Sequence, residues 1–390
     1  MYVFLYFSGS QVFSSWQWWN YCCGQIPEGK AALRINLDET SVCLFQGDQK
    51  GNVFVGKKRR REGQPAQRIP RKRRRTCLTH VAFVCDRSDL QPLLPQVIIG
   101  NEATLPARAM ARLRSLCPAN VYLVRQKSAW NNSTLCSVIV RWLALALRPH
   151  IANLQPVLFL DAVRLHTTPS VVLACNRAGI WVLVVPAKTT WLLQPLDTHA
   201  FLPFKAWLRE AYQRARIEAV AGDLNVEQFL GCLYSAIRQV LQGRRWAAAF
   251  DANGFSDRQS QVSRFVRSSL GIGPEDLLQV PSSRPTVEQL QDCFPRNARV
   301  PVAALWRPFD GPPAAPAASA SSSRSSSSAV ALALGASDAR WGRTRSQHRR
   351  ALAVVEEQEE QEDEVLAEVP AVSTGVPRGR RLPSATMRRR

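Results

Sequence analysis

The stretch from residue 157 to 205 constrains the fold most, because two short apolar runs enclose a segment of helical length. The runs VLFL (157–160) and IWVLVV (180–185) are rich in β-branched and aromatic residues and lack polar alternation. Such runs are typical of strands that are buried on both faces. Thr168 and Pro169 predict the start of the intervening helix, and Gly179 predicts its left-handed end. The stretch therefore predicts a strand, a crossover helix and a second strand parallel to the first.

Two aspartates lie at one edge of this predicted unit. Asp161 directly follows the first strand, and Asp197 follows the second strand at the start of another helix. Open α/β sheets place ligands and chemistry outside the carboxyl ends of their parallel strands. We therefore expect any chemistry of the chain at this edge.

The preceding residues predict further strands. Residues 31–45 read as a first strand that contains Asp38, and 52–55 and 77–86 complete a three-stranded meander. The apolar islands at 95–100 and 121–124 predict additional strands. A helix is expected to begin at Asn132 or Ser133. We expect the nearby Trp130 and Trp142 to belong to the core.

The charge of the chain favours a polyanionic partner. It has 51 Lys and Arg against 30 Asp and Glu, a formal net charge of +21, and nucleic acid is the commonest partner of such chains. The alternative is that the charge lies in disordered tails. Ten cysteines without a CxxC pair and only five histidines provide no zinc module. Single cysteines at apolar positions favour reduced core residues of an intracellular protein, and no stretch reaches transmembrane length.

Residues 57–75 carry 11 Lys and Arg against one Glu. Two basic clusters with a polar spacer resemble a bipartite nuclear import signal, and they would also attract phosphates. A solvated loop is the third interpretation. The candidate nucleic-acid-binding residues of this run are Lys57, Lys58, Arg59, Arg60, Arg61, Arg71, Lys72, Arg73, Arg74 and Arg75.

Asp38, Asp161 and Asp197 together indicate a particular chemistry. Carboxylates at one sheet edge repel one another unless a cation compensates their charge. Two Mg²⁺ or Mn²⁺ ions held by three acids form a site for in-line phosphoryl displacement.

Three motifs around these acids resemble those of the DDE superfamily endonucleases, the pogo/Tigger and mariner-like transposases. They are NLDETSV (36–42), VLFLDAVRLH (157–166) and VVPAKTTWLLQPLDTHAFLPFK (184–205), and KSAWN (127–131) resembles a small/Trp motif of the family. The last two acids have 35 residues between them, close to the family spacing. The matching residues are Asp38, Asp161, His166, Pro186, Thr190, Gln194, Pro195 and Asp197.

The resemblance implies an α/β, RNase H-like mixed sheet flanked by helices, with the three aspartates as catalytic residues and ligands of Mg²⁺ or Mn²⁺. It implies DNA as the partner, and a homodimer is one assembly that it allows. The basic run at 57–75 favours the nucleus as the location, and the lack of a long apolar stretch argues against a membrane. Lys188 and Lys205 would contact DNA phosphates or lie on a solvated face. His166 is expected to be a structural hydrogen-bonding residue rather than a metal ligand.

The expected organisation has four parts. Residues 1–30 are unassigned, 31–255 form the endonuclease domain with 57–75 as a basic insertion, 256–310 form a helical extension, and 311–390 form a disordered low-complexity tail.

Two features separate the chain from an ordinary transposase. Ala162 stands where the family commonly has Asn, and the residues before Asp38 show no helix-turn-helix pattern. We therefore expect a transposon-derived protein that lacks its N-terminal DNA-recognition region. Three functions stay open: a metal-dependent endonuclease that cleaves or transfers DNA strands, an inactive domesticated relative that binds DNA or a protein, and an unrelated α/β enzyme.

Overall fold

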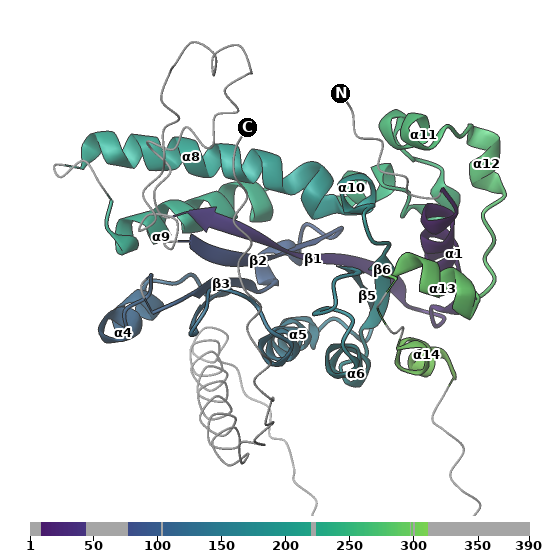
Figure 1. Cartoon of the computed structure of the whole chain (residues 1–390), viewed down its shortest axis with the longest axis horizontal. Coiled ribbons are helices and arrows are strands. Elements are labelled where there is room, and N and C mark those ends of the chain that lie inside the picture. The colour runs from purple at the N-terminus through teal and green to yellow at the C-terminus, as the bar shows by residue number, and fades with distance from the viewer. Residues whose placement is uncertain are drawn as a thin grey trace, which may run out of the picture. The chain divides into compact units, whose positions relative to one another are not determined.

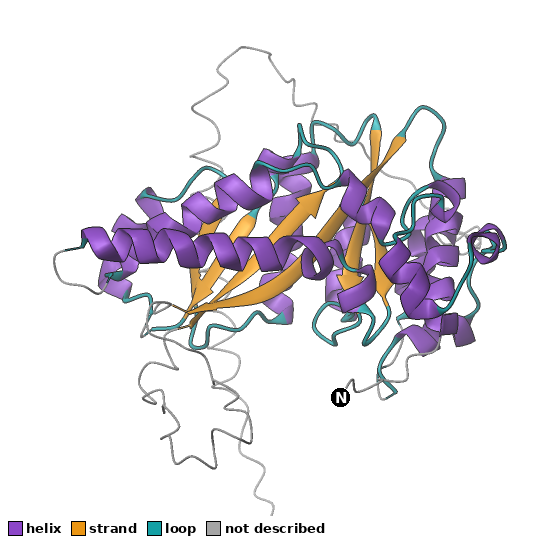
Figure 2. Ribbon diagram, turned by 90° about the horizontal axis from the view of Figure 1, so that it is seen from above, coloured by secondary structure: helices purple, strands orange, loops and turns teal. Residues whose placement is uncertain are grey.

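A six-stranded mixed sheet forms the centre of the computed structural model, which describes residues 9–43, 77–102, 104–219, 224–296, 298 and 301–310. The strand order is β4-β3-β2-β1-β5-β6. Figure 2 shows the twisted sheet enclosed by helices. The strands are β1 (Ala31–Cys43), β2 (Cys77–Cys85), β3 (Gln96–Gly100), β4 (Val121–Arg125), β5 (Leu154–Asp161) and β6 (Trp181–Val185).

The topology of the sheet is RNase H-like, as expected. Strands β1, β2 and β3 form an antiparallel meander, and β5 and β6 run parallel to β1 on its other side. Strand β4 pairs in parallel with β3 and extends the sheet by one edge strand. Strand β1 therefore lies inside the sheet, between its antiparallel partner β2 and its parallel partner β5.

The predicted order within the meander was wrong in one respect. The strand expected over 77–86 is β2, which pairs with β1 along nine consecutive residues from Ile35 opposite Cys85 to Cys43 opposite Cys77. The third strand of the meander is β3, which the apolar island at 95–100 predicted. Residues 52–55, expected to pair between these strands, lie outside the described residues. Because β1 and β2 pair directly, no strand lies between them.

The crossover unit forms as the sequence predicted. Strands β5 and β6 are parallel, and helix α6 (Pro169–Arg177) connects them. Thr168 precedes the helix and Gly179, with φ of 69°, follows it. A left-handed residue at this position is least costly for glycine, which lacks a Cβ. Both ends of α6 lie where the local sequence predicted, although the Thr168 side chain makes no capping hydrogen bond and donates to the Leu165 carbonyl instead.

Helices cover both faces of the sheet. In Figure 1, α8 and α9 lie on one face and α4, α5 and α6 on the other. Helix α5 begins after Asn132, whose side chain accepts a hydrogen bond from the Leu135 amide. Asn132 was one of the two residues predicted to start this helix. The remaining α-helices are α1 (Gly9–Gln25), α4 (Ala107–Ser115), α5 (Ser133–Leu147), α7 (Thr190–Leu193), α8 (Phe201–Glu218), α9 (Val226–Ala236), α10 (Ala247–Ala252), α11 (Arg264–Leu270), α12 (Pro274–Leu278), α13 (Val287–Cys293) and α14 (Val302–Asp310).

Helix α1, in the segment that the sequence left unassigned, packs into the core. Trp16 and Trp19 are buried, and their indole N–H groups donate to the carbonyls of Asn253 and Ser256, each at 3.1 Å. Gly254 has φ of 89°, and a Cβ there would overlap the Trp16 indole. The N-terminal helix is therefore joined to the segment after α10 by buried contacts.

The other tryptophan expected in the core, Trp142, is there. Its exposed fraction is 2%, and it stacks on Tyr122 with ring centroids 4.1 Å apart. Among the described residues, no helix has the length and apolar character needed to cross a membrane.

Buried His80 makes the stability of this fold depend on pH. Burial lowers the pKa of His80 to about 4, and its Nε2 lies 3.0 Å from Gln96 Oε1. The unfolded chain binds the proton at its ordinary pKa near 6.5, so stability is lost as pH falls from about 6.5 towards 4.

We expect protonation of His80 in the unfolded chain to lower the free energy of unfolding by up to about 3 kcal/mol between pH 6.5 and pH 4. Urea unfolding of the protein and of His80→Phe at several pH values measures it, because the variant lacks the titrating ring. Parallel pH profiles for the two proteins would contradict the assignment.

Candidate active site

The three predicted acids come from three neighbouring elements. Asp38 lies within β1, Asp161 is the last residue of β5, and Asp197 lies in a π-helical turn, η2 (Leu196–Ala200), before α8. In the parallel register Asn36 lies opposite Phe159. Asp38 and Asp161 each follow these residues by two positions, so both stand at the same level of the sheet.

The acids interact strongly with one another. Burial raises the pKa of Asp38 well above its usual value, and the charges of Asp197, Asp161 and Glu39 raise it further. Burial also raises the pKa of Asp197, although hydrogen bonds with Thr190 and Asp38 and the charge of Lys205 oppose the rise. The edge therefore holds an excess of negative charge in a poorly solvated place.

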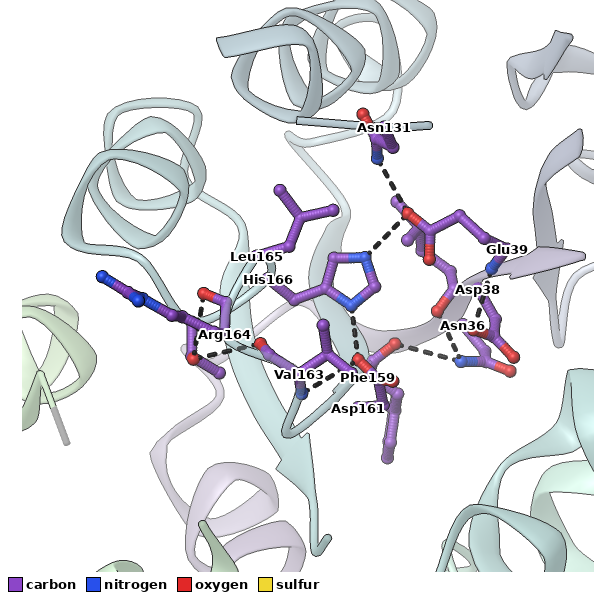
Figure 3. Close-up of polar contacts among 12 residues, drawn as sticks. Asn36, Asp38, Glu39, Asn131, Phe159, Asp161, Val163, Arg164, Leu165 and His166 are labelled. Carbon is purple, nitrogen blue, oxygen red and sulfur yellow. Dashed lines mark hydrogen bonds and ion pairs between the residues drawn. The ribbon is translucent and has the colours of Figure 1, made fainter. Parts of the chain in front are cut away.

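His166 connects two of the carboxylates, as Figure 3 shows. Its Nδ1 lies 2.5 Å from Asp161 Oδ1, and its Nε2 lies 3.0 Å from Glu39 Oε1. Burial alone would lower the pKa of His166, but Glu39 and Asp161 raise it well above its usual value. A carboxylate at each ring nitrogen favours the form of His166 in which both nitrogens carry protons, because each nitrogen can then donate a hydrogen bond.

A buried asparagine connects the elements that carry the acids. The Nδ2 of Asn36 donates to the Phe159 carbonyl at 3.1 Å, and its Oδ1 accepts from the Leu196 amide at 2.9 Å. One side chain thus joins β1, β5 and η2. It holds the backbone next to Asp197 against the strand that carries Asp38.

Sequence reasoning missed three polar residues of this site. Asn36 and Glu39 were quoted only as parts of the first motif, and Asn131 only as part of KSAWN. The Nδ2 of Asn131 donates to Glu39 Oε1 at 2.8 Å, which places the KSAWN stretch beside β1 (Figure 3). A polar residue within an otherwise apolar strand was the available signal, because a buried polar group requires a partner.

Trp130 corrects another expectation. It was predicted to be a core residue, but its exposed fraction is 76%. The reason is its position just before the α5 cap, where the chain turns towards Glu39 and the indole stays outside. Trp191 is also exposed, at 44%, and its indole N–H donates to the Lys188 carbonyl at 3.0 Å.

The two predicted phosphate-binding lysines at this edge are exposed. Lys188 has a left-handed φ of 69°. The Nζ of Lys205 lies 5.6 Å from the Phe201 ring centroid, and its charge reaches Asp197. The ten basic candidates between residues 57 and 75 lie outside the described residues.

The donor set suits a hard divalent cation, because three carboxylates with mutual repulsion gain most from added positive charge. Within the part of the chain that is described, however, no three His, Cys, Asp or Glu side chains are gathered closely enough to hold a metal ion. A shared coordination shell of Asp38, Asp161 and Asp197 therefore stays a prediction.

Comparison with known proteins identifies the domain. Residues 79–246 match the family of DDE superfamily endonucleases. The chain contains a DDE superfamily endonuclease domain. The resemblance to this superfamily is confirmed. The matched range includes Asp161 and Asp197, whereas Asp38 and the first motif (36–42) precede it.

Searches among curated proteins and solved structures were also made for the whole chain. No curated protein matches the chain. A solved structure titled Mos1 transposase paired-end complex with left transposon end is 15% identical with a TM-score of 0.33. The alignment covers 65% of this chain, and the chain spans 65% of the length of that transposase.

Replacing Asp38 by Asn tests the charge excess. The substitution keeps the shape of the side chain and removes a buried charge, so we expect the free energy of unfolding at neutral pH to rise by about 1 kcal/mol or more. Urea unfolding in a chelator-containing buffer measures the change. Asp292→Asn, at an exposed position, is the matched control and should change stability little. A loss of stability in Asp38→Asn would show that attractive contacts outweigh repulsion.

Proposed function

We propose that the chain is a transposase-derived DDE endonuclease of the pogo and mariner-like kind, which cleaves or transfers DNA strands with Asp38, Asp161 and Asp197. The observation that carries the proposal is the electrostatic coupling of these acids, from β1, β5 and η2, at the edge of the matched domain. Carboxylates whose pKa values are raised, as those of Asp38 and Asp197 are, are typical of catalytic sites.

Divalent Mg²⁺ or Mn²⁺, held by the three aspartates, would activate the attacking hydroxyl and stabilise the leaving oxygen of a phosphodiester. The residues of the chain prepare the acids for this role. Asn36 holds the backbone beside Asp197, and His166 orients Asp161 through a hydrogen bond to one carboxylate oxygen, Oδ1.

The surroundings of the acids favour DNA as the substrate. Exposed Trp130 and Trp191 each adjoin a residue that hydrogen-bonds to the acids: Asn131 to Glu39, and Thr190 to Asp197. Exposed aromatic rings stack on unpaired bases, and lysines contact phosphates. The Trp191 indole donates to the Lys188 carbonyl, and the charge of Lys205 reaches Asp197, so phosphate and base contacts would occur close to the acids.

A second function has its own support. His166 already hydrogen-bonds to Asp161 and Glu39, and the described side chains form no ready metal cage. Both observations favour a domesticated relative that binds DNA or a protein without cleaving it. We treat this as the alternative that the cleavage experiment decides. A homodimer is compatible with either function.

Cleavage of supercoiled plasmid by the full chain is the main test. With Mg²⁺ or Mn²⁺ we expect nicked circles, and we expect Asp161→Asn to lower the nicking rate by at least about 100-fold, since two-metal chemistry needs each ligand. Asp292→Asn is the control and should nick at the unmutated rate.

Two outcomes would contradict the endonuclease proposal. No metal-dependent nicking by the unmutated protein would support the inactive binder. Nicking that Asp161→Asn retains would indicate a contaminating nuclease or another site.

The basic run is proposed to contact DNA phosphates and to direct nuclear import. Replacing its ten candidate lysines and arginines by Gln should weaken duplex binding and flatten its salt dependence, by a slope of about 0.9 for each lost phosphate contact. The same variant, fused to a fluorescent reporter, should lose nuclear accumulation. Lys188→Gln with Lys205→Gln tests the described lysines separately. Unchanged affinity and unchanged localisation after neutralisation would make the run a bystander.

A further inference from the structure

Two cysteines face each other where β1 ends and β2 begins. Cys43 is the last residue of β1, and Cys77, the first residue of β2, is its direct partner in the antiparallel register. Their Sγ atoms lie 3.1 Å apart, and both side chains are only partly buried. This pair lies outside the acid cluster and has no role in the proposed cleavage.

The geometry suits a covalent link. Directly opposed residues of antiparallel strands have Cβ atoms about 4.5–5.5 Å apart, and a disulfide brings them to about 3.5–4.5 Å, so the two Cβ atoms have to approach by about 1 Å. The two sulfurs already touch, so bond formation requires only a small approach and no rearrangement of the strands. Partial exposure leaves room for a small oxidant to reach the pair.

The two thiols differ in reactivity. A hydrogen bond from the Cys77 thiol lowers the pKa of Cys43 to about 7, against the effect of burial, and the charge of Lys205 lowers it further. The same hydrogen bond raises the pKa of Cys77. Because the thiolate is the nucleophile, Cys43 is the sulfur that reacts first near neutral pH and Cys77 the one that resolves.

We propose that Cys43 and Cys77 form a reversible peroxide-oxidised disulfide site. The Cys43 thiolate attacks one oxygen of a peroxide, becomes a sulfenic acid and releases water or an alcohol. The Cys77 thiol then attacks the sulfenic sulfur, the S–S bond forms, and a water molecule leaves. Two thiols are oxidised by two electrons, the peroxide is reduced, and a dithiol reductant reverses the reaction.

The position of the pair determines what the disulfide would do. It would hold the ends of β1 and β2 together on either side of 33 intervening residues that carry the basic run. In the unfolded chain the same link would close a loop of that length, which lowers the entropy of the unfolded state. Oxidation therefore anchors both ends of the most basic segment to the sheet and stabilises the fold, whether or not the chain cleaves DNA.

The test uses the full chain, reduced and then exposed to a small excess of hydrogen peroxide. We expect peptide mapping under non-reducing conditions to recover a Cys43–Cys77 linked pair, which dithiothreitol removes. The oxidised protein should melt at least about 5 °C higher than the reduced protein. Brief alkylation of the untreated protein at neutral pH should label Cys43 well before buried Cys136.

Matched variants complete the experiment. Cys43→Ser and Cys77→Ser should each abolish both the linked peptide and the rise in melting temperature, whereas Cys23→Ser, at another partly buried cysteine, should retain both. Linkage of Cys43 to a different cysteine, linkage between two chains, or oxidation of Cys43 to the sulfinic acid with Cys77 still free would overturn the proposal. The alkylation and mapping of the unmutated chain give this answer even if a serine variant fails to fold.

Discussion

Repulsion among carboxylates at the edge of the sheet is the constraint on which the site depends. Asp38 is buried beside Asp197, Asp161 and Glu39, and each neighbour makes its ionised form less favourable. His166 stands between Asp161 and Glu39 and hydrogen-bonds to both, and the two carboxylates raise its pKa well above its usual value. An arrangement that is costly for folding persists only where surrounding contacts hold it, and such cost is expected at functional sites.

The contacts that hold it extend through the whole domain. Asn36 joins β1 to β5 and to the turn before α8. At the other end of β1, Arg34 pairs with Asp86 at 2.7 Å and with Asp251 at 2.5 Å, which connects the strand to β2 and α10. Two-partner guanidinium contacts of this kind orient the strand as well as stabilise it. Segments far apart in sequence therefore determine where Asp38 stands.

Sequence reasoning succeeded where local chemistry decides the outcome. The crossover unit from β5 to β6, the placement of Asp161 and the Asn132 cap all follow from short patterns of apolar, capping and glycine residues. It failed where contacts are distant. The strand at 77–85 was placed one position too far from β1, and Trp130 was expected inside the core, because neither pairing partners nor solvent exposure can be read from a local pattern.

The sequence by itself determined the fold class, the two parallel strands and the resemblance to DDE superfamily endonucleases. These features depend on hydrophobic periodicity and on motif residues that lie close together along the chain. Only the tertiary structure decided that His166 binds Asp161 and Glu39 and that α1 packs against the segment after α10. Only it brought Cys43 into contact with Cys77. These contacts join residues from different strands and helices, and their partners are set by sheet register and helix packing, which no local stretch of sequence specifies.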